Sequence, residues 1–298
     1  MKYQKYLSKF QTLEGKNIII TGANSGIGFE TCKYVLALKG NVIMACRNLN
    51  KAEDAKNKLL EEFPSSNIKV YQYDQASLSS IENFVHALKE NKVEIDGLIC
   101  NAGVYYPKKD MKTIDGFELT IGTNYIGTSY LLDSLKDVLN NKRVVVVSSL
   151  TATLAKDYGL ENIDKLSRNK LYGFSKFLLC KNAYERIYNE SYELVVVHPG
   201  ICATNILTSK DTGLSSWFSL LGRKFLNIFV HSASKAALIL IEGLLCSYQK
   251  GLYIKPRGPF AISGYPTIKK LPKKFKSEGL IQKTRVYTQK VGKDVISK

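Results

Sequence analysis

The chain has 298 residues, 45% of them hydrophobic and 23% charged, with a formal net charge of +17. These proportions are ordinary for a globular protein with a sizeable core, so they exclude a disordered or fibrous chain. No run approaches the roughly 18 apolar residues of a membrane span. The first residues lack the apolar segment of a signal peptide, and we therefore expect a cytoplasmic protein.

Six cysteines are scattered along the sequence without C-x-x-C spacing. They predict buried, reduced thiols, with no metal site and no disulfide framework. Residues 250–298 hold 11 Lys and 2 Arg against one Glu and one Asp, which is 13 minus 2, or +11. Two interpretations of this basic segment stay open: a weak contact with an anionic membrane, or a solvated tail. No nucleic-acid motif accompanies the charge, so no nucleic-acid partner is predicted.

In chain order, the first element is an apolar, β-branched run that leads into the glycine-rich stretch at residues 21–28. Helical spacing of apolar residues begins at Ile27. Strand, glycine turn and helix in this order can hold a phosphate, because the backbone comes close and free N–H groups at the helix start attract negative charge. A plain strand-to-helix connector is the alternative.

Apolar β-rich runs alternate with helical patterns almost to the end of the chain. Residues 144–147 are all valine, and such uninterrupted runs indicate a parallel sheet covered by helices on each side. We predict an α/β, doubly wound Rossmann fold with a seven-stranded parallel sheet and helices on both faces. The expected strands are 16–21, 41–46, 68–73, 97–100, 143–148, 193–198 and 252–254, and the expected helices are 27–39, 49–62, 78–91, 114–139, 170–190 and 232–248.

The domain organisation follows from this pattern. Residues 13–256 are predicted to form one catalytic domain, with an N-terminal arm at 1–12 and a basic C-terminal extension at 257–298. The aromatic-rich segment 201–231 is interpreted either as a lid over a substrate or as an extra helix packed on the core.

The second strand ends at Arg47. An NAD site would place an acidic residue about 20 positions after the glycines, but no Asp or Glu occurs between Glu30 and Glu53. A guanidinium suits a 2′-phosphate, so we predict NADP(H) over NAD(H), with a solvated strand-end arginine as the alternative.

The third and fourth strands also end in candidate ligand contacts. Asp74, followed by Gln75, could accept from an adenine amino group or cap the next helix. The run Asn101-Ala102-Gly103 has small residues that let the backbone approach a flat ligand.

Tyr172 and Lys176 lie at positions i and i+4 of a helical pattern, which brings an ammonium near a phenol. At an effective dielectric of about 20 and about 4 Å, unit charges interact by roughly 4 kcal/mol, or about three pKa units. Tyr172 could then act as an acid or base near neutral pH. Ser149 follows the fifth strand, where a hydroxyl can bond a substrate oxygen. Asn124 is either locally bonded or holds water near a reacting group.

Together, the glycine pattern, the 101–103 run, the Tyr172–Lys176 pair and Pro199-Gly200 resemble the short-chain dehydrogenase/reductase family in its single-domain form. The resemblance covers about residues 13–256. Residues 45–48 and the wide gap between Ser149 and Tyr172 are similar to the NADP-dependent retinol-dehydrogenase-like and protochlorophyllide-reductase-like branch. This resemblance implies an oxidoreductase that interconverts a carbonyl and an alcohol by hydride transfer. Four aromatic residues suggest a small, apolar or aromatic substrate: Tyr105, Tyr106, Tyr158 and Trp217.

The resemblance also implies residue roles. Tyr172 would be the acid/base, Lys176 would bond the nicotinamide ribose and lower the Tyr172 pKa, Ser149 would hold the substrate oxygen, and Asn124 would position a water. The implied cofactor-binding residues are Gly22, Asn24, Ser25, Gly26, Ile27, Gly28, Arg47, Asp74, Gln75, Asn101, Ala102, Gly103, Tyr172, Lys176, Pro199, Gly200 and Thr204.

Two further expectations follow from the family. Its members often pair through the two long helices, here near 114–139 and 170–190, so a homodimer is expected. The alternative function is a non-catalytic NADP(H)-binding regulator, although such a protein would not need Ser149, Tyr172 and Lys176 together.

Overall fold

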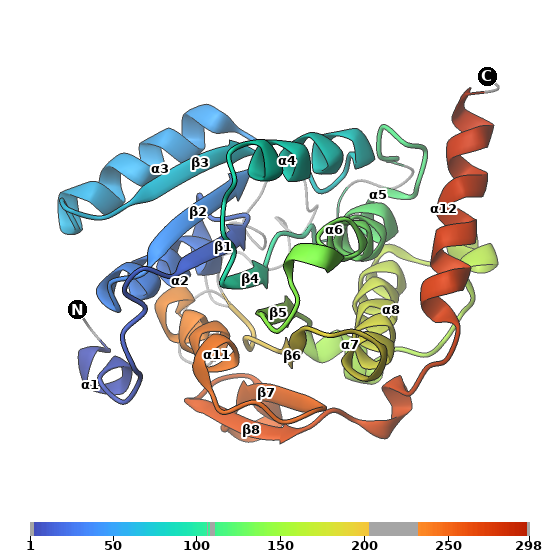
Figure 1. The fold of residues 1–298 in the computed structure, drawn as a ribbon. Helices are drawn as coiled ribbons and strands as arrows, with labels where there is room; N and C mark the ends of the chain where they lie inside the picture. The colour runs from blue at the N-terminus through green and yellow to red at the C-terminus, as the bar shows by residue number, and fades with distance from the viewer. Residues whose placement is uncertain (1–2, 106, 108–110, 203–231, 297–298) are drawn as a thin grey trace, which may run out of the picture.

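An eight-stranded sheet lies at the centre of the molecule (Figure 1). The computed structural model of the chain describes residues 3–105, 107, 111–202 and 232–296. The strand order is β3-β2-β1-β4-β5-β6-β7-β8. The first seven strands are parallel and β8 runs antiparallel to β7. The bounds are β1 (Asn17–Thr21), β2 (Asn41–Cys46), β3 (Ile68–Gln72), β4 (Gly97–Cys100), β5 (Arg143–Val147), β6 (Glu193–Val197), β7 (Leu252–Pro256) and β8 (Pro266–Lys270).

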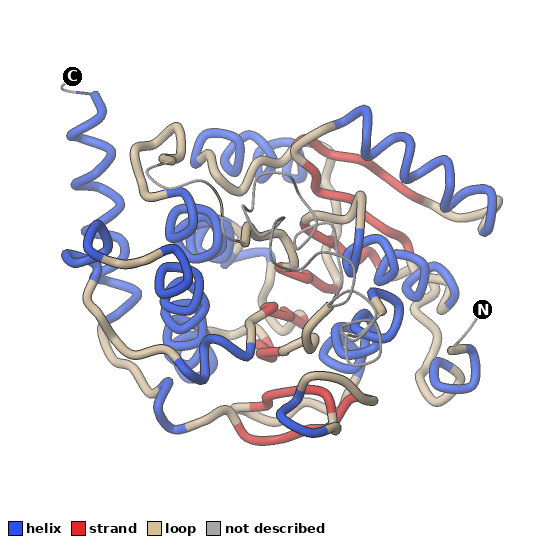
Figure 2. Tube along the Cα trace, turned by 180° about the vertical axis from the view of Figure 1, so that it is seen from behind, coloured by secondary structure: helices blue, strands red, loops and turns tan. Residues whose placement is uncertain are grey.

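The central strands β1, β2, β4, β5 and β6 are almost entirely apolar because both faces of the sheet are buried there. In β1, Ile19 belongs to one hydrophobic cluster while Ile18 and Ile20 belong to the other. Successive side chains of a strand point to opposite faces, so a strand between two cores carries no polar face. Figure 2 shows the strands enclosed between two layers of helices.

Each face has its own set of helices. The first cluster is formed with α4 (Leu78–Glu90), α6 (Thr128–Ser134) and α8 (Arg168–Asn189), and the second with α2 (Gly26–Ala37), α3 (Leu49–Glu62) and α11 (Ala233–Leu245). The predicted Rossmann fold is therefore confirmed.

The sheet has one strand more than we predicted. Strand β8 lies in the segment expected as a basic extension, and Ile268 faces Ile254 of β7 in the ladder. Its five residues include two lysines, and three of the five are exposed. A short edge strand with so little apolar content gives almost no periodic signal, which is why the sequence did not reveal it.

The helix expected at 114–139 begins later and is less regular than the pattern suggested. Gly116 has φ +88°, a left-handed conformation that interrupts a helix. The helical path runs through α5 (Leu119–Ile121), a π-helical turn η1 (Gly122–Gly127), α6 and a short 3₁₀ turn (Lys136–Val138). Apolar spacing alone cannot show a turn that contains one extra residue.

Both described ends of the chain pack on the central fold. At the N-terminal end, α1 (Gln4–Leu7) is held to α11 because the Tyr6 hydroxyl and the Lys9 ammonium both bond the Glu242 carboxylate. At the C-terminal end, α12 (Leu280–Ile296) lies beside α6 and α8 (Figure 1).

The cysteines and helices bear on two of the sequence-based expectations. All six cysteines are buried and free. Within the described part of the chain, none of the helices combines the length and the apolar composition that crossing a bilayer requires. Most of the aromatic-rich segment 201–231, interpreted above as a lid or an extra helix, lies outside the described residues.

Candidate active site

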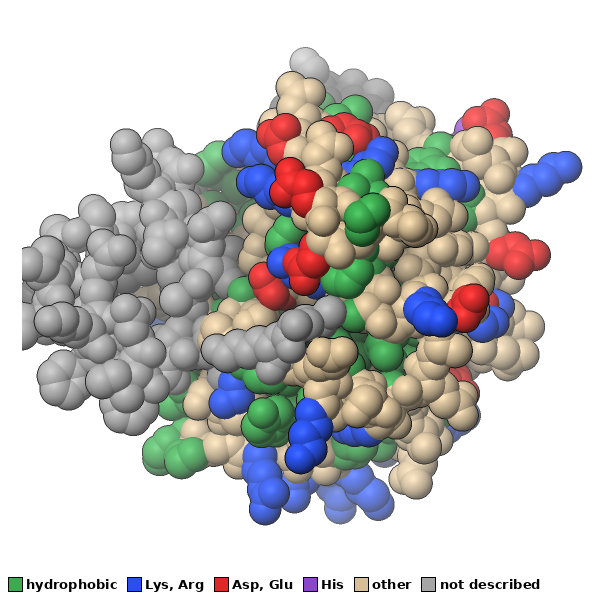
Figure 3. All heavy atoms as spheres, turned by 90° about the vertical axis from the view of Figure 1, so that its left-hand side faces the viewer, with side chains coloured by type: hydrophobic (Ala, Val, Ile, Leu, Met, Phe, Trp, Pro, Cys, Tyr) green, Lys and Arg blue, Asp and Glu red, His purple; other side chains and the backbone are tan. Residues whose placement is uncertain are grey.

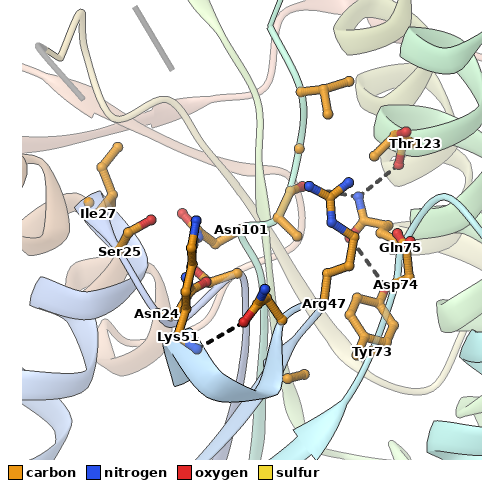
Figure 4. Close-up of a pocket in the computed structure, with 17 residues that line it drawn as sticks. Asn24, Ser25, Ile27, Arg47, Lys51, Tyr73, Asp74, Gln75, Asn101 and Thr123 are labelled. Atoms are coloured by element: carbon orange, nitrogen blue, oxygen red, sulfur yellow. Dashed lines mark hydrogen bonds between the residues drawn. The ribbon is translucent and has the colours of Figure 1, made fainter. Parts of the chain in front are cut away.

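A cavity of about 390 Å³ opens at the carboxyl ends of the parallel strands. Figure 4 shows its lining side chains, which come from the ends of strands β1 to β4 and the segments that follow them. This is the edge where ligands bind in doubly wound sheets. The lining residues are Gly22, Asn24, Ser25, Gly26, Ile27, Ala45, Arg47, Asn48, Lys51, Tyr73, Asp74, Gln75, Asn101, Ala102, Gly103, Val104 and Thr123.

The glycine turn brings backbone to the cavity in a way that larger residues would not permit. Gly22 and Gly26 have φ of +66° and +57°, which side chains disfavour. A Cβ at Gly28 would lie 2.3 Å from the Gly22 carbonyl oxygen. Within the described structure Ser25, the N-cap of α2, makes no side-chain capping bond, so the first N–H groups of this helix stay available for an anion.

Thr21 and Asn101 hold the ends of β1 and β4 together. The Thr21 hydroxyl accepts hydrogen bonds from the backbone N–H groups of Asn101 (3.0 Å) and Ala102 (2.9 Å). The Asn101 side-chain amide donates to the Thr21 carbonyl at 3.0 Å. These bonds fix the floor of the cavity between the two strands.

Two cationic side chains extend over the cavity (Figure 4). Arg47 ends β2, and Lys51 lies in the first turn of α3. The Asn48 side chain caps that helix by accepting from the Lys51 N–H at 2.9 Å. The sequence prediction named Arg47 and missed Lys51. The missed signal was its position four residues after Arg47, at the start of a helix that begins at the ligand edge.

Asp74 and Gln75 line the cavity in different ways. An Asp74 carboxylate oxygen accepts from the Ala76 N–H at 2.9 Å. The N-cap of α4 is Ser77, so the idea that Asp74 caps this helix is wrong. The Gln75 amide donates to the carbonyls of Ala102 (3.0 Å) and Thr123 (2.7 Å). These two hydrogen bonds link the segment after β4 and the π-helical turn η1 to the end of β3.

The Ser149 side chain lies close to the Tyr172 phenol and acts to lower its pKa. The Ser149 oxygen accepts from the Thr151 hydroxyl at 3.0 Å, which leaves its own hydrogen for the Tyr172 phenol. Ser148 turns instead to the buried Cys180 thiol, 2.9 Å away. The Tyr105 ring meets the Tyr172 ring edge-on, with centroids 4.7 Å apart. The structure thus brings Ser149 rather than Ser148 to the tyrosine.

The expected lowering of the Tyr172 pKa by Lys176 is not what the structure shows. Burial raises the pKa of Tyr172 to about 12, against a lowering effect of the Ser149 side chain. Burial also lowers the pKa of Lys176 to about 8. The Lys176 ammonium donates to the Val147 carbonyl at 2.9 Å. Helical spacing places the two residues on one face, but the pKa of each is shifted chiefly by its own burial.

Asn124 is fully buried in the π-helical turn η1, and its side-chain oxygen and nitrogen both form hydrogen bonds within the protein. It accepts from the Val104 N–H at 2.8 Å and donates to the Val104 carbonyl at 2.9 Å and the Ser175 hydroxyl at 3.1 Å. Both amide hydrogens are used inside the protein, so the side chain clamps Val104 rather than offering donors to water. Sequence reasoning missed Val104 and Ser175, because only the fold brings them to Asn124.

Gly103 connects the cavity to these catalytic candidates. A Cβ at Gly103 would lie 2.9 Å from the Asn124 side-chain oxygen and 3.6 Å from the Lys176 nitrogen. Ser149, Tyr172, Lys176 and Asn124 therefore gather next to the lined cavity without being part of its lining.

Pro199 and Gly200 follow β6 at the same edge of the sheet, and Gly200 has φ +89°. Neither contributes to the lining. Thr204 lies outside the described residues. No cluster of three or more His, Cys, Asp and Glu that could hold a metal ion occurs among the described residues.

Comparison with known protein families shows which family the chain belongs to. A model described as short chain dehydrogenase matches residues 16–214. The chain belongs to the short-chain dehydrogenase family. Members of this family are oxidoreductases that work with a nicotinamide cofactor.

Curated short-chain dehydrogenase relatives match parts of the chain. The WW domain-containing oxidoreductase of Gallus gallus is 44% identical over 140 residues, 46% of this chain and 34% of that protein. Protochlorophyllide reductase of Daucus carota is 41% identical over 149 residues, 47% and 37% of the two chains. Retinol dehydrogenase 14 of Mus musculus is 35% identical over 216 residues, 65% and 63% of the two chains. The chain thus spans about a third to two thirds of the length of these relatives.

Solved structures of this fold also match. An uncharacterised protein from Mycobacterium paratuberculosis aligns with a TM-score of 0.72 and 24% identity, over 96% of this chain and 97% of that one. The NADPH-dependent 3-quinuclidinone reductase of Rhodotorula rubra aligns with a TM-score of 0.63 and 17% identity, over 83% and 91%. At these identities the likeness shows the fold.

The cavity residues fit a dinucleotide. The glycine turn leaves no room for a Cβ at Gly28, the Ser25 side chain does not cap the first amides of α2, and two cations line the cavity. Backbone N–H groups and positive side chains are what a pyrophosphate and a further phosphate require.

Proposed function

We propose that the chain is an NADP(H)-dependent oxidoreductase that interconverts a carbonyl and an alcohol, with Tyr172 as the acid/base. The observation that carries this proposal is the cluster of Ser149, Tyr172 and Lys176 beside the cavity at the carboxyl ends of the parallel strands. When bound, the nicotinamide supplies or accepts the hydride. The protein must then hold the substrate oxygen and move one proton.

Tyr172 is the proton donor in the reducing direction. With a pKa raised to about 12, its phenol is protonated at neutral pH and can give a proton to the oxygen that becomes the alcohol. Ser149 would donate to the same oxygen and hold it near the phenol. Lys176 would bond the cofactor ribose, and its charge would favour the phenolate once the proton has left.

The substrate is proposed to be apolar or aromatic. The Tyr105 ring packs edge-on against Tyr172 and places an aromatic surface beside the reacting phenol. Among the curated relatives, two are named for retinol and protochlorophyllide. The alternative of a non-catalytic NADP(H)-binding regulator predicts binding of the cofactor without turnover.

The test is a screen of NADPH oxidation across aldehydes, ketones, quinones and retinoids, followed by the Tyr172→Phe variant. We expect Tyr172→Phe to bind NADPH as the wild type does and to lose turnover by about 100-fold or more, since it removes the acid/base. Tyr188→Phe is the matched control, because Tyr188 lies exposed on the same helix. Undiminished turnover in Tyr172→Phe would contradict the proposed mechanism. No turnover by the wild type would favour the non-catalytic NADP(H)-binding regulator.

The choice of NADP(H) is tested through Arg47 and Lys51. Both cations lie where a 2′-phosphate would add negative charge, so Arg47→Gln and Lys51→Gln should each raise the KM for NADPH about tenfold, as expected for a lost charged contact. The KM for NADH should stay unchanged. Lys56→Gln is the control, since Lys56 lies on the same helix and pairs with Glu53 at 3.2 Å. A wild-type preference for NADH would refute the assignment.

A further inference from the structure

Helix α12 is anchored to two helices of the active-site region by side-chain contacts. The Glu185 carboxylate of α8 accepts from the Leu280 N–H at 2.8 Å and from the Ile281 N–H at 3.3 Å, so it caps the start of α12. Asp133 of α6 accepts two bonds from the Arg285 guanidinium, at 2.9 and 3.2 Å. Figures 1 and 2 both show α12 running beside these helices.

One contact of α12 reaches the turn that carries Asn124. The Tyr125 hydroxyl is hydrogen-bonded to the Thr284 hydroxyl of α12. The Thr284 hydroxyl donates its own hydrogen to the Leu280 carbonyl at 2.7 Å, so Tyr125 must be the donor to Thr284. Tyr125 has no exposed surface and Thr284 has only 3%.

The turn that Tyr125 belongs to needs external support. Residues Gly122–Gly127 form a π-helical turn, a rare widened form that occurs mostly as single turns inside α-helices and often at functional sites. Successive side chains leave a helix in different directions. Asn124 bonds Val104 and Ser175 on the inner side, while Tyr125 bonds α12 on the outer side. If the turn closed to ordinary α-helical spacing, the Asn124 amide would rotate away from Val104.

We propose that Thr284 is a positioning residue for catalysis: it holds the Tyr125 phenol and so fixes the widened turn that places Asn124 beside Lys176 and Gly103. This inference rests on the proposed function, because it assigns Asn124 to the reacting end of the cavity. The C-terminal helix then belongs to the catalytic scaffold, although it lies outside the region matched by the family model.

The experiment compares three single variants of the full chain. Thr284→Val keeps the shape of the side chain and removes the acceptor for Tyr125. Thr284→Ser restores the hydroxyl. Thr288→Val is the matched control, because the Thr288 hydroxyl lies one turn further along and donates only to the Thr284 carbonyl of its own helix, at 2.9 Å.

We measure kcat and KM for the best carbonyl substrate, the dissociation constant of NADPH, and hydrogen exchange of the backbone amides at 122–128. For Thr284→Val we expect kcat to fall about tenfold, because a small misplacement of an active-site group is costly. The NADPH dissociation constant should be unchanged and the amides of the turn should exchange faster. Thr284→Ser and Thr288→Val should match the wild type.

Wild-type kcat in Thr284→Val would overturn the proposal, and so would equal losses in Thr284→Val and Thr288→Val. If Thr284→Val does not fold, Tyr125→Phe removes the same hydrogen bond from the other side and is judged by the same criteria. Failure of the proposed function is seen separately, as continued turnover by Tyr172→Phe. The amide exchange then still reports whether Thr284 holds the turn.

Discussion

Lys176 carries an ammonium with only 5% of its surface exposed, beside the cavity and one helical turn from Tyr172. Burial takes water away from a charge, and the single carbonyl of Val147 at 2.9 Å compensates only in part. The pKa of Lys176 therefore falls from 10.5 to about 8. A bound cofactor that offers further oxygens to this ammonium would reverse part of that shift.

The lowered pKa predicts how stability depends on pH. Below about pH 8 the ammonium is charged in both folded and unfolded chains, so the folded state bears the full cost of burial. Between about 8 and 10.5 the folded chain releases the proton first, so the free energy of unfolding rises with pH, by up to about 1.4 kcal/mol per pH unit. Lys176→Met should lack this rise.

Urea unfolding at several pH values between about 7.5 and 9.5 gives the free energy of unfolding of each protein. The effect is the free energy of unfolding of the wild type minus that of Lys176→Met. A buried thiol such as Cys202, whose pKa burial raises to about 12, acts in the opposite sense at the alkaline end. It occurs in both chains, and its pKa is shifted by burial rather than by Lys176, so its effect largely drops out of the difference. Parallel curves for the two proteins would contradict the buried charge.

At the scale of the element, the strand–turn–helix unit at β1 and α2 depends on close backbone approach. The Gly22 carbonyl and the Asn101 amide crowd the position where a Cβ of Gly28 would lie, at 2.3 and 2.8 Å. The sequence predicted this unit from its glycines, and the structure adds the reason for the third glycine. It packs the helix against its own turn and against the end of β4.

Gly28→Ala should therefore lower the free energy of unfolding by about 1–3 kcal/mol, because the methyl group forces backbone apart, and should weaken NADPH binding. Gly173→Ala, within α8, is the matched control. Its added Cβ meets the Thr151 carbonyl at an ordinary 3.5 Å, and alanine favours a helix by about 0.5–1 kcal/mol. Urea unfolding of both variants checks the contrast, and equal effects would refute the crowding argument.

At the scale of the whole molecule, the C-terminal segment is part of the fold. Strand β8 extends the sheet and α12 occupies the outer side of α6 and α8. A homodimer through the helices near 114–139 and 170–190, which the family resemblance implies, would have to include or displace α12. The pairing remains a prediction, and α12 is the element that any such interface must accommodate.

The basic side chains of residues 250–277 are a second feature of the whole molecule. Residues 250–277 contain eight Lys and Arg and no Asp or Glu, and they run along β7, β8 and the turns that join them. Figure 3 shows Lys and Arg side chains gathered along the lower edge of the molecule. Lysines on an exposed edge strand also discourage pairing with another sheet. The contact with an anionic membrane thus stays a proposal beside this simpler role.

The sequence by itself determined the alternation of strands and helices, the glycine turn, Arg47 at the end of β2, and the candidate set Ser149, Tyr172 and Lys176. These features are local, because hydrophobic period and short spacings are read along the chain. Only the tertiary structure decided which groups meet: Val104 and Ser175 around Asn124, Lys51 beside Arg47, and Thr284 against Tyr125. Burial, which depends on every neighbour at once, moved the Tyr172 pKa opposite to the direction that helical spacing suggested.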